Sequence, residues 1–135
     1  MEIRKAILSD IDWLAAHDHH VSAAMLTKKI HDGEIYVVAE RENIGWLRYG
    51  LFWDSIPFMN LLFLLEGYRN QGIGKKLVEY WERDMVQQGY KIVFTSTQAN
   101  EFAQHFYRKL GYTDIGGFIV PQEVMEIMLM KNIAP

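Results

Sequence analysis

The stretch that decides the fold is residues 64–76, which read LLEGYRNQGIGKK. An apolar run over residues 58–65 leads into it, and helical spacing of apolar residues starts at Ile73. Backbone N–H groups at a helix start attract anions, and glycines let a phosphate come close to the backbone. The stretch therefore predicts a strand, a phosphate-binding loop and a helix. A flexible strand-to-helix turn without a ligand is the alternative.

Two common phosphate loops do not fit this stretch. The Walker pattern needs Gly-Lys-Ser/Thr after four intervening residues, and Gly67 is followed at that distance by Gly72 and Ile73. The dinucleotide fingerprint needs a third glycine where Leu77 stands. Neither class of nucleotide-binding protein is therefore expected.

The alternation of apolar and polar residues predicts the other strands, and the helical spacing of apolar residues predicts the other helices. The expected order is β-α-α-β-β-β-α-β-α-β-β. This is an α/β (α+β) fold class with a mixed, mostly antiparallel sheet and one central βαβ crossover. Strands are expected at residues 2–6, 35–40, 44–53, 58–65, 91–96, 115–120 and 124–130, and helices at 9–18, 21–30, 73–89 and 100–111.

The expected helix ends rest on capping residues. Ser9 and Asp12 resemble a capping box, and Asn100 is a good N-cap. Gly89 and Gly111 are expected to stop their helices. The continuous apolar run at residues 58–65 predicts a central strand buried on both faces.

Composition restricts the classes of protein that the chain can belong to. The 135 residues are 50% hydrophobic and 23% charged, which predicts one globular domain over residues 1–135. A net charge of -3 argues against nucleic acid or anionic lipid as a partner. The absence of Cys excludes disulfides, thiolate metal sites and a cysteine nucleophile. No membrane span or signal peptide is expected, so the predicted location is cytoplasmic.

Two motifs together resemble one family. Arg69, Gly72 and Gly74 meet the pattern Arg/Gln-x-x-Gly-x-Gly/Ala, after a strand and before a helix. Residues 100–112, NEFAQHFYRKLGY, resemble Asn-x-x-Ala-x-x-Phe/Leu-Tyr-x-x-x-Gly-Phe/Tyr. With the order of elements, the whole chain resembles the GNAT superfamily of N-acetyltransferases, whose fold is the acyl-CoA N-acyltransferase (GNAT) fold.

The resemblance implies that acetyl-CoA is the acetyl donor. The backbone of residues 62–64 would pair with the pantetheine arm as an added strand. The N–H groups of residues 70–75 would wrap the pyrophosphate, with Arg69 supporting the loop. Asn100 would approach the arm, and Tyr107 would lie near the thioester sulfur. The cofactor-binding residues implied are Leu62, Phe63, Leu64, Arg69, Asn70, Gln71, Gly72, Ile73, Gly74, Lys75, Asn100 and Tyr107.

The resemblance also implies the catalytic groups, Tyr107 and Glu66. Tyr107 would stabilise the departing thiolate, although its place on an apolar helix stripe also fits a core tyrosine. Relatives often carry a glutamate where Thr95 stands and a proline where Glu66 stands. The base is therefore either Glu66, acting through water, or is not needed because the acceptor amine has a low pKa. Glu66 also fits a solvated loop residue.

The predicted reaction is direct transfer to a primary amine in a ternary complex, because no Cys can form an acetyl-enzyme. A small-molecule amine is expected among Trp46, Tyr49 and Trp53, near the turn at residues 17–20. The histidines of that turn surround a helix end, so no metal site is expected. The alternatives are a protein or peptide N-acetyltransferase and an inactive acyl-CoA-binding module. A homodimer is compatible with the sequence.

Overall fold

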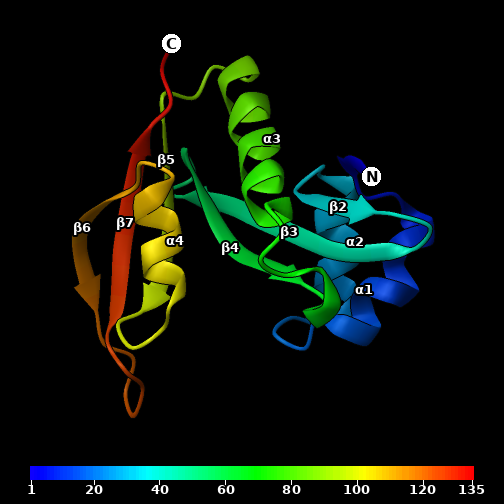
Figure 1. Ribbon diagram of the computed structural model, residues 1–135, viewed down its shortest axis with the longest axis horizontal. Helices are drawn as coiled ribbons and strands as arrows, with labels where there is room; N and C mark the ends of the chain where they lie inside the picture. The colour runs from blue at the N-terminus through cyan, green and yellow to red at the C-terminus, as the bar shows by residue number, and fades with distance from the viewer. The chain divides into compact units, whose positions relative to one another are not determined.

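A computed structural model describes residues 1–135 and confirms the expected order of elements (Figure 1). The strands form one seven-stranded sheet in the order β1-β2-β3-β4-β5-β7-β6. The pair β4–β5 is parallel, and the pairs β1–β2, β2–β3, β5–β7 and β6–β7 are antiparallel. The mixed sheet with a central crossover is therefore confirmed. The elements are β1 (Glu2–Lys5), α1 (Ile11–His17), α2 (Ala23–His31), β2 (Ile35–Ala39), β3 (Asn43–Phe52), β4 (Ile56–Leu64), α3 (Ile73–Gln87), β5 (Ile92–Gln98), α4 (Ala103–Lys109), β6 (Thr113–Phe118) and β7 (Glu126–Asn132), with short 3-10 helices at Leu8–Asp10 and Glu66–Tyr68.

The chain divides into two compact units. The first unit contains Met1–Tyr49 and Leu61–Trp81, and the second contains Gly50–Asn60 and Glu82–Pro135. β3, β4 and α3 each contribute residues to both units. No helix is both long and apolar enough to cross a membrane.

In the first unit, α1 and α2 pack against one face of β2 and β3 (Figure 1). Period-2 alternation sends Val37 and Tyr36 to opposite faces of β2. Tyr36 stacks on Tyr49 with ring centroids 6.1 Å apart, and Tyr49 lies 5.8 Å from Trp81 of α3. The apolar core under α1 and α2 consists of Ala6, Leu14, Leu26, Ile35, Val37 and Trp46.

In the second unit, a buried polar network joins α3 to the strands. The Tyr112 hydroxyl donates to Glu82 Oε2 at 2.7 Å, and Lys131 Nζ lies 2.9 Å from Glu82 Oε1. The same carboxylate thus binds the segment between α4 and β6 as well as β7. Its negative charge and the burial of the phenol raise the pKa of Tyr112, burial being the larger cause.

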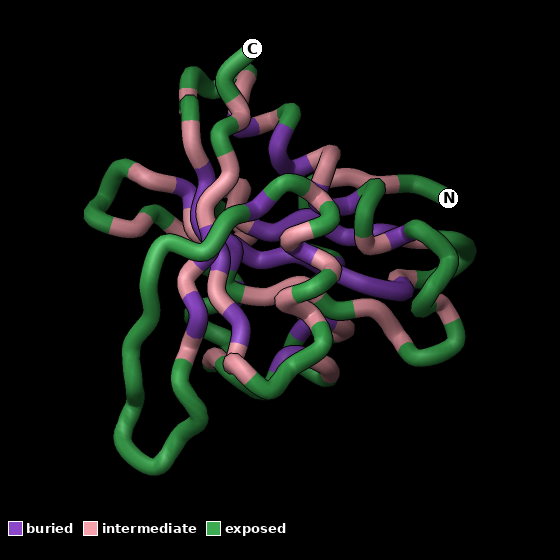
Figure 2. The backbone as a smooth tube through the Cα atoms, turned by 60° about the vertical axis from the view of Figure 1, so that its left-hand side comes forward, coloured by how far each residue is buried: buried purple, intermediate pink, exposed green.

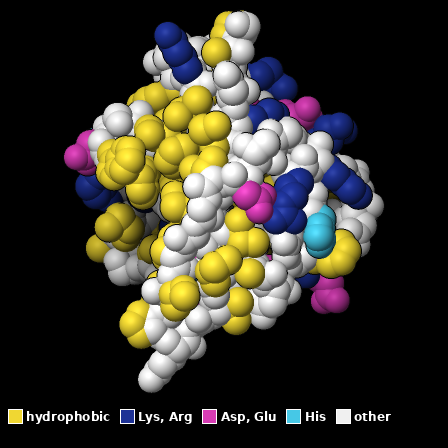
Figure 3. Space-filling view, turned by 90° about the vertical axis from the view of Figure 1, so that its left-hand side faces the viewer, with side chains coloured by type: hydrophobic (Ala, Val, Ile, Leu, Met, Phe, Trp, Pro, Cys, Tyr) yellow, Lys and Arg dark blue, Asp and Glu magenta, His cyan; other side chains and the backbone are white.

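The edge strand β6 and the turn that follows it are exposed along their whole length (Figure 2). Hydrophobic side chains gather on the face of the second unit that carries this hairpin (Figure 3). An open edge with apolar side chains is a surface on which strands of other chains can pair. The exposed apolar residues here are Ile115, Phe118, Ile119, Val120, Val124 and Met125.

Two expected helix starts are wrong. Asp10, not Ser9, closes the turn before α1, because its carboxylate accepts from Ile7 N at 2.8 Å. That carboxylate also binds Arg4 at 2.8 Å, and this ion pair holds the pKa of Asp10 at about 2. Asn100 does not cap α4, which begins three residues later at Ala103. A separate turn closes first, where Gln98 N donates to Glu101 Oε1 at 3.2 Å.

The strand β4 starts earlier than expected and is less buried. The gap expected between the strands at residues 44–53 and 58–65 is a short turn between Phe52 and Ile56, in which Trp53 and Asp54 adopt φ values of 55° and 59°. Its central place in the sheet is confirmed by the strand order. Full burial on both faces is wrong: Phe63 is 37% exposed, and Met59 is fully enclosed.

Close packing at Gly45 brings β3 against the end of β4. A Cβ atom there would lie 2.5 Å from Leu64 Cδ2 and 2.6 Å from Phe63 O. A backbone hydrogen bond from Leu65 N to Ile44 O, at 2.8 Å, holds the two segments together. Only glycine allows this approach without movement of the chain.

We expect Gly45→Ala to destabilise the protein by about 1–3 kcal/mol, because it forces a backbone shift in a packed region. The control is Gly67→Ala, since no atom lies within 4 Å of a Cβ at that position. Urea unfolding of both variants is the measurement. Equal stability of the two variants would show that β3 can move away from β4 at little cost.

Candidate active site

The predicted cofactor strand is the last part of β4. The parallel ladder between β4 and β5 is short: it pairs Phe58 with Phe94 and Met59 with Thr95. β4 then continues to Leu64, and β5 continues to Gln98. Residues 62–64 therefore lie beyond the last paired residues of that ladder.

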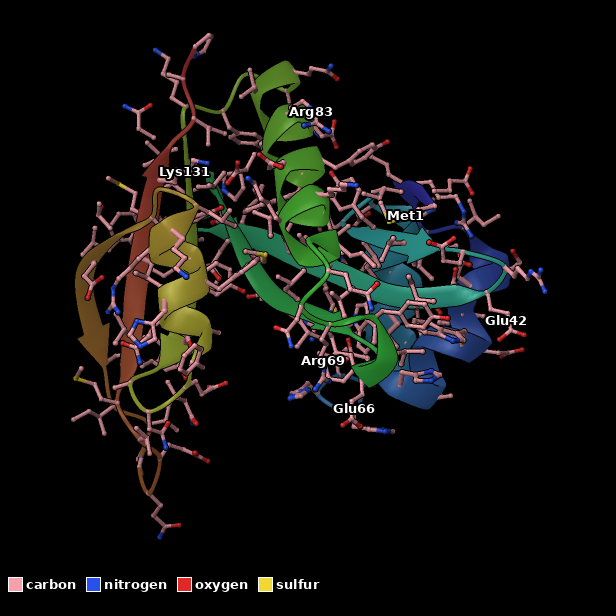
Figure 4. The ribbon with its side chains drawn as sticks, viewed as in Figure 1. Met1, Glu42, Glu66, Arg69, Arg83 and Lys131 are labelled. Atoms are coloured by element: carbon pink, nitrogen blue, oxygen red, sulfur yellow. The ribbon has the colours of Figure 1, made fainter.

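The side chain of Arg69 ties the loop after β4 to the strand end. Its Nε donates to Leu64 O at 2.9 Å, and its guanidinium lies 5.0 Å from the centre of the Phe63 ring. Gln71 Nε2 donates to Gly67 O at 3.1 Å, which braces the loop a second time. Arg69 thus joins the loop to the end of β4 (Figure 4), and its part in cofactor binding stays a prediction.

The backbone between Arg69 and α3 turns so that N–H groups precede the helix. Asn70 and Gly72 have φ values of 61° and 80°, in the left-handed region. Lys76 N donates to Gly72 O at 3.2 Å, and the N–H groups just before it have no intrahelical acceptor. A Cβ on Gly72 would meet no atom within 4 Å. The loop therefore offers donors and open space for an anion.

Glu66 lies in the short 3-10 helix after β4. Its side chain is exposed and has no hydrogen-bond or ion-pair partner (Figure 4). Nothing fixes the direction of its carboxylate. A catalytic role of Glu66 stays a prediction without a supporting contact.

Tyr107 and Asn100 belong to the second unit. Tyr107 is only 6% exposed, and its ring packs edge-on against Tyr112 at 5.6 Å. Burial raises the pKa of Tyr107 to about 12, and a hydrogen bond with the Thr95 hydroxyl offsets part of the shift. Thr95 in turn donates to Met59 O at 3.0 Å. Asn100 is exposed in the turn before α4.

The predicted acceptor pocket among three aromatic residues is wrong. Trp46 packs in the core beneath α1 and α2, whereas Tyr49 packs on Trp81 across the sheet. The odd spacing between the two residues along β3 sends them to opposite faces. Trp53 lies in the other unit and is 77% exposed.

A different aromatic cluster is formed in the first unit. Trp13 stacks on His17 with centroids 4.2 Å apart, and Trp46 contacts both rings. Phe63 lies 5.1 Å from Trp46 and carries Arg69 on its own ring. We call Trp13, His17, Trp46 and Phe63 the aromatic cluster. It extends from the end of α1 to the strand that carries the predicted cofactor site.

A buried ion pair fixes the turn that follows α1. Asp18 Oδ2 lies 2.9 Å from Arg48 Nε and accepts from Trp46 Nε1 at 3.3 Å. Its other oxygen accepts from His20 N at 3.1 Å. The turn is therefore bound to β3 by one carboxylate. No group of three or more His, Cys, Asp or Glu residues could hold a metal ion.

Sequence reasoning missed Trp13, Asp18 as an ion-pair partner and Arg48. Asp18 and Arg48 are 30 residues apart and carry no motif. The signal that was available is the charged Arg48 within an otherwise apolar strand. A charge on such a strand needs a buried partner.

Comparison with known proteins identifies the family of the chain. The acetyltransferase (GNAT) family model matches residues 6–112. The chain therefore belongs to the acetyltransferase (GNAT) family. An uncharacterized N-acetyltransferase of Chlorobaculum tepidum is 30% identical over 81 residues, which is 60% of this chain and 50% of that protein. The matched segment thus spans half the length of that curated relative.

Solved structures share the fold over nearly the whole chain. A GNAT-family acetyltransferase of Bacillus cereus has a TM-score of 0.78 and 21% identity, covering 97% of this chain and 96% of that one. Ard1 of Thermoplasma volcanium has a TM-score of 0.84 and 14% identity, covering 99% and 98%. An aminoglycoside 6'-N-acetyltransferase complexed with coenzyme A has a TM-score of 0.81 and 18% identity, covering 100% and 98%. At these identities the likeness establishes the fold.

We expect Asp18→Asn to destabilise the protein by about 3–5 kcal/mol, because it leaves the Arg48 guanidinium buried without a charged partner. The double variant Asp18→Leu with Arg48→Met removes both charges and recovers most of that loss. Thermal and urea unfolding measure both. A single variant within about 0.5 kcal/mol of wild type would show that water solvates Arg48, as it does at ordinary surface sites.

Proposed function

We propose that the protein transfers an acetyl group from acetyl-CoA to a primary amine, by direct attack in a ternary complex. The observation that carries the proposal is the loop at residues 69–75, with its Arg69 brace, its left-handed turns and its open space at Gly72. Oriented N–H groups at a helix start suit a pyrophosphate. The family and the neighbour with bound coenzyme A support the same ligand.

In this proposal the end of β4 and the loop bind the cofactor. The backbone of residues 62–64 pairs with the pantetheine arm, and residues 70–75 surround the pyrophosphate. Asn100 approaches the arm from the second motif. The proposed cofactor-binding side of the first unit therefore uses backbone groups more than side chains.

Tyr107 is proposed to stabilise the departing thiolate. With a pKa of about 12, against ~8.5 for a thiol, full proton donation would be uphill by about 5 kcal/mol. A hydrogen bond that strengthens as charge develops on sulfur needs no complete transfer. The raised pKa therefore favours a hydrogen-bonding role over a general-acid role.

The acceptor in this proposal is a small-molecule amine, with a protein or peptide amine as the competing class. The apolar edge of β6 supports the association of two copies, which the sequence leaves open. Coenzyme A release with a panel of small amines and N-terminal peptides tests the activity. Release with a small amine supports the proposal, and release with peptides alone overturns the small-molecule class. Binding of acetyl-CoA without any release would assign the chain to the acyl-CoA-binding modules.

Acetyl-CoA at about a hundred times its Kd is expected to stabilise the protein by ~2.7 kcal/mol and to raise the Tm by several degrees. Gly72→Leu is expected to remove most of that shift, because its side chain fills the space proposed for the pyrophosphate. Gly89→Leu is the control: it has a φ of 94° and open space, at the other end of α3. If both variants lose the rise in Tm, the loss comes from backbone strain and not from a blocked pyrophosphate site.

Tyr107→Phe removes the hydroxyl and keeps the packing of the ring. We expect kcat to fall by roughly 10²–10⁴, the range for a positioned donor or charge stabiliser, with little change in acetyl-CoA affinity. Steady-state kinetics and calorimetry measure the two quantities. A variant as fast as wild type would make Tyr107 a core residue only.

A further inference from the structure

The imidazole of His17 has one ring nitrogen occupied and one free. Nδ1 lies 2.7 Å from the carbonyl oxygen of Trp13. Because a carbonyl oxygen only accepts, Nδ1 carries the proton, and Nε2 holds the lone pair of a neutral imidazole. Nε2 has no hydrogen-bond partner. The structure thus presents an oriented proton acceptor.

The surroundings of His17 fix the plane of that ring. Trp13 stacks on it at 4.2 Å, and Trp46 borders it at 6.4 Å. The side chain is half-buried at the last residue of α1. Its neighbours His19 and His20 are exposed and make no ring contacts of this kind.

The charged groups near His17 belong to the turn and to two strands. The carboxylate of Asp18 forms an ion pair with Arg48 of β3, and His20 Nδ1 lies 3.9 Å from the same carboxylate. On the β4 side, Arg69 covers Phe63. No carboxylate is therefore left free in these contacts to take the role of the imidazole.

The aromatic cluster connects His17 to the proposed cofactor strand. Trp46 contacts both the imidazole, at 6.4 Å, and the Phe63 ring, at 5.1 Å, and Phe63 neighbours Leu64 at the strand end. All these residues belong to the first unit. Glu66, the base predicted from the sequence, belongs to the same unit and has neither a partner nor a fixed direction.

We propose that His17 is the catalytic proton acceptor for the amine substrate, through Nε2 and either directly or through one water molecule. This inference rests on the proposed acetyl transfer. Nε2 takes a proton from the ammonium group and becomes imidazolium. The free amine then attacks the thioester carbon, so that a C–N bond forms and the C–S bond breaks. Its electron pair leaves on sulfur, a second amine proton passes to the thiolate, and His17 releases its proton to solvent.

The test compares His17→Gln with His19→Gln as the matched control. The kcat/KM of each is measured against pH, with a simple alkylamine and with an amino-acid amide whose amine has a lower pKa. We expect His17→Gln to lower kcat/KM for the alkylamine by roughly 10²–10⁴, the range for general-base catalysis. In His17→Gln the fall of kcat/KM at acidic pH (the acidic limb of the pH profile) disappears. The loss of kcat/KM with the amino-acid amide is smaller than with the alkylamine. His19→Gln keeps both the rate and the limb.

Rescue separates a proton acceptor from a structural role. Added imidazole is expected to restore turnover to His17→Ala in a saturable way, while calorimetry shows unchanged acetyl-CoA binding. The proposal is overturned if His17→Gln keeps the acidic limb of the pH profile, or if His17→Ala loses rate and added imidazole does not restore it. It is also overturned if His20→Gln or Glu66→Gln, and not His17→Gln, loses that limb. Wild-type protein that binds acetyl-CoA and acetylates no amine overturns the proposed function itself, and the role of His17 falls with it.

Discussion

The arrangement of the first unit depends on the buried carboxylate of Asp18. It binds Arg48 and Trp46 of β3 and the backbone of His20, so one side chain joins the α1–α2 turn to the sheet. Such a pair adds little net stability, because two charges lose their water. Its effect is to define a single position for the turn. His17, the last residue of α1 and the neighbour of Asp18, is fixed in place by the same contacts.

The sequence predicts the helices and strands well because the apolar residues in them recur at regular helical or alternating spacing. Glycine also marks the end of α4, where Gly111 has a φ of 98°. Capping predictions fail at Ser9 and Asn100, since Arg4 holds Asp10 and the turn before α4 closes on its own residues. Local propensity cannot include such contacts. The error at residues 46 and 49 is of another kind, because alternation along β3 already separates them.

The candidate site divides in the same way between what a motif specifies and what packing specifies. Arg69 and the glycine loop could be predicted because backbone geometry there needs particular residue types. The role of Tyr107 is a prediction that only the resemblance makes, and no sequence pattern indicates its contact with Thr95. Their hydrogen bond and the burial of the phenol come from packing on β5, and these two facts set the pKa of Tyr107 near 12. A motif names the residue, and the fold determines its acidity.

The same reasoning distinguishes the two candidate bases. A free glutamate side chain loses up to ~2 kcal/mol of conformational entropy when it is held for catalysis, and Glu66 has no contact that meets this cost in advance. His17 is already held by the Trp13 carbonyl and the stacked indole. The hydrogen bond at Nδ1 also keeps the proton of the neutral imidazole on that nitrogen. In an exposed imidazole the proton would be distributed between the two ring nitrogens. Folding has thus oriented the lone pair before any substrate arrives, and preorganisation of this kind is what makes a proton acceptor effective.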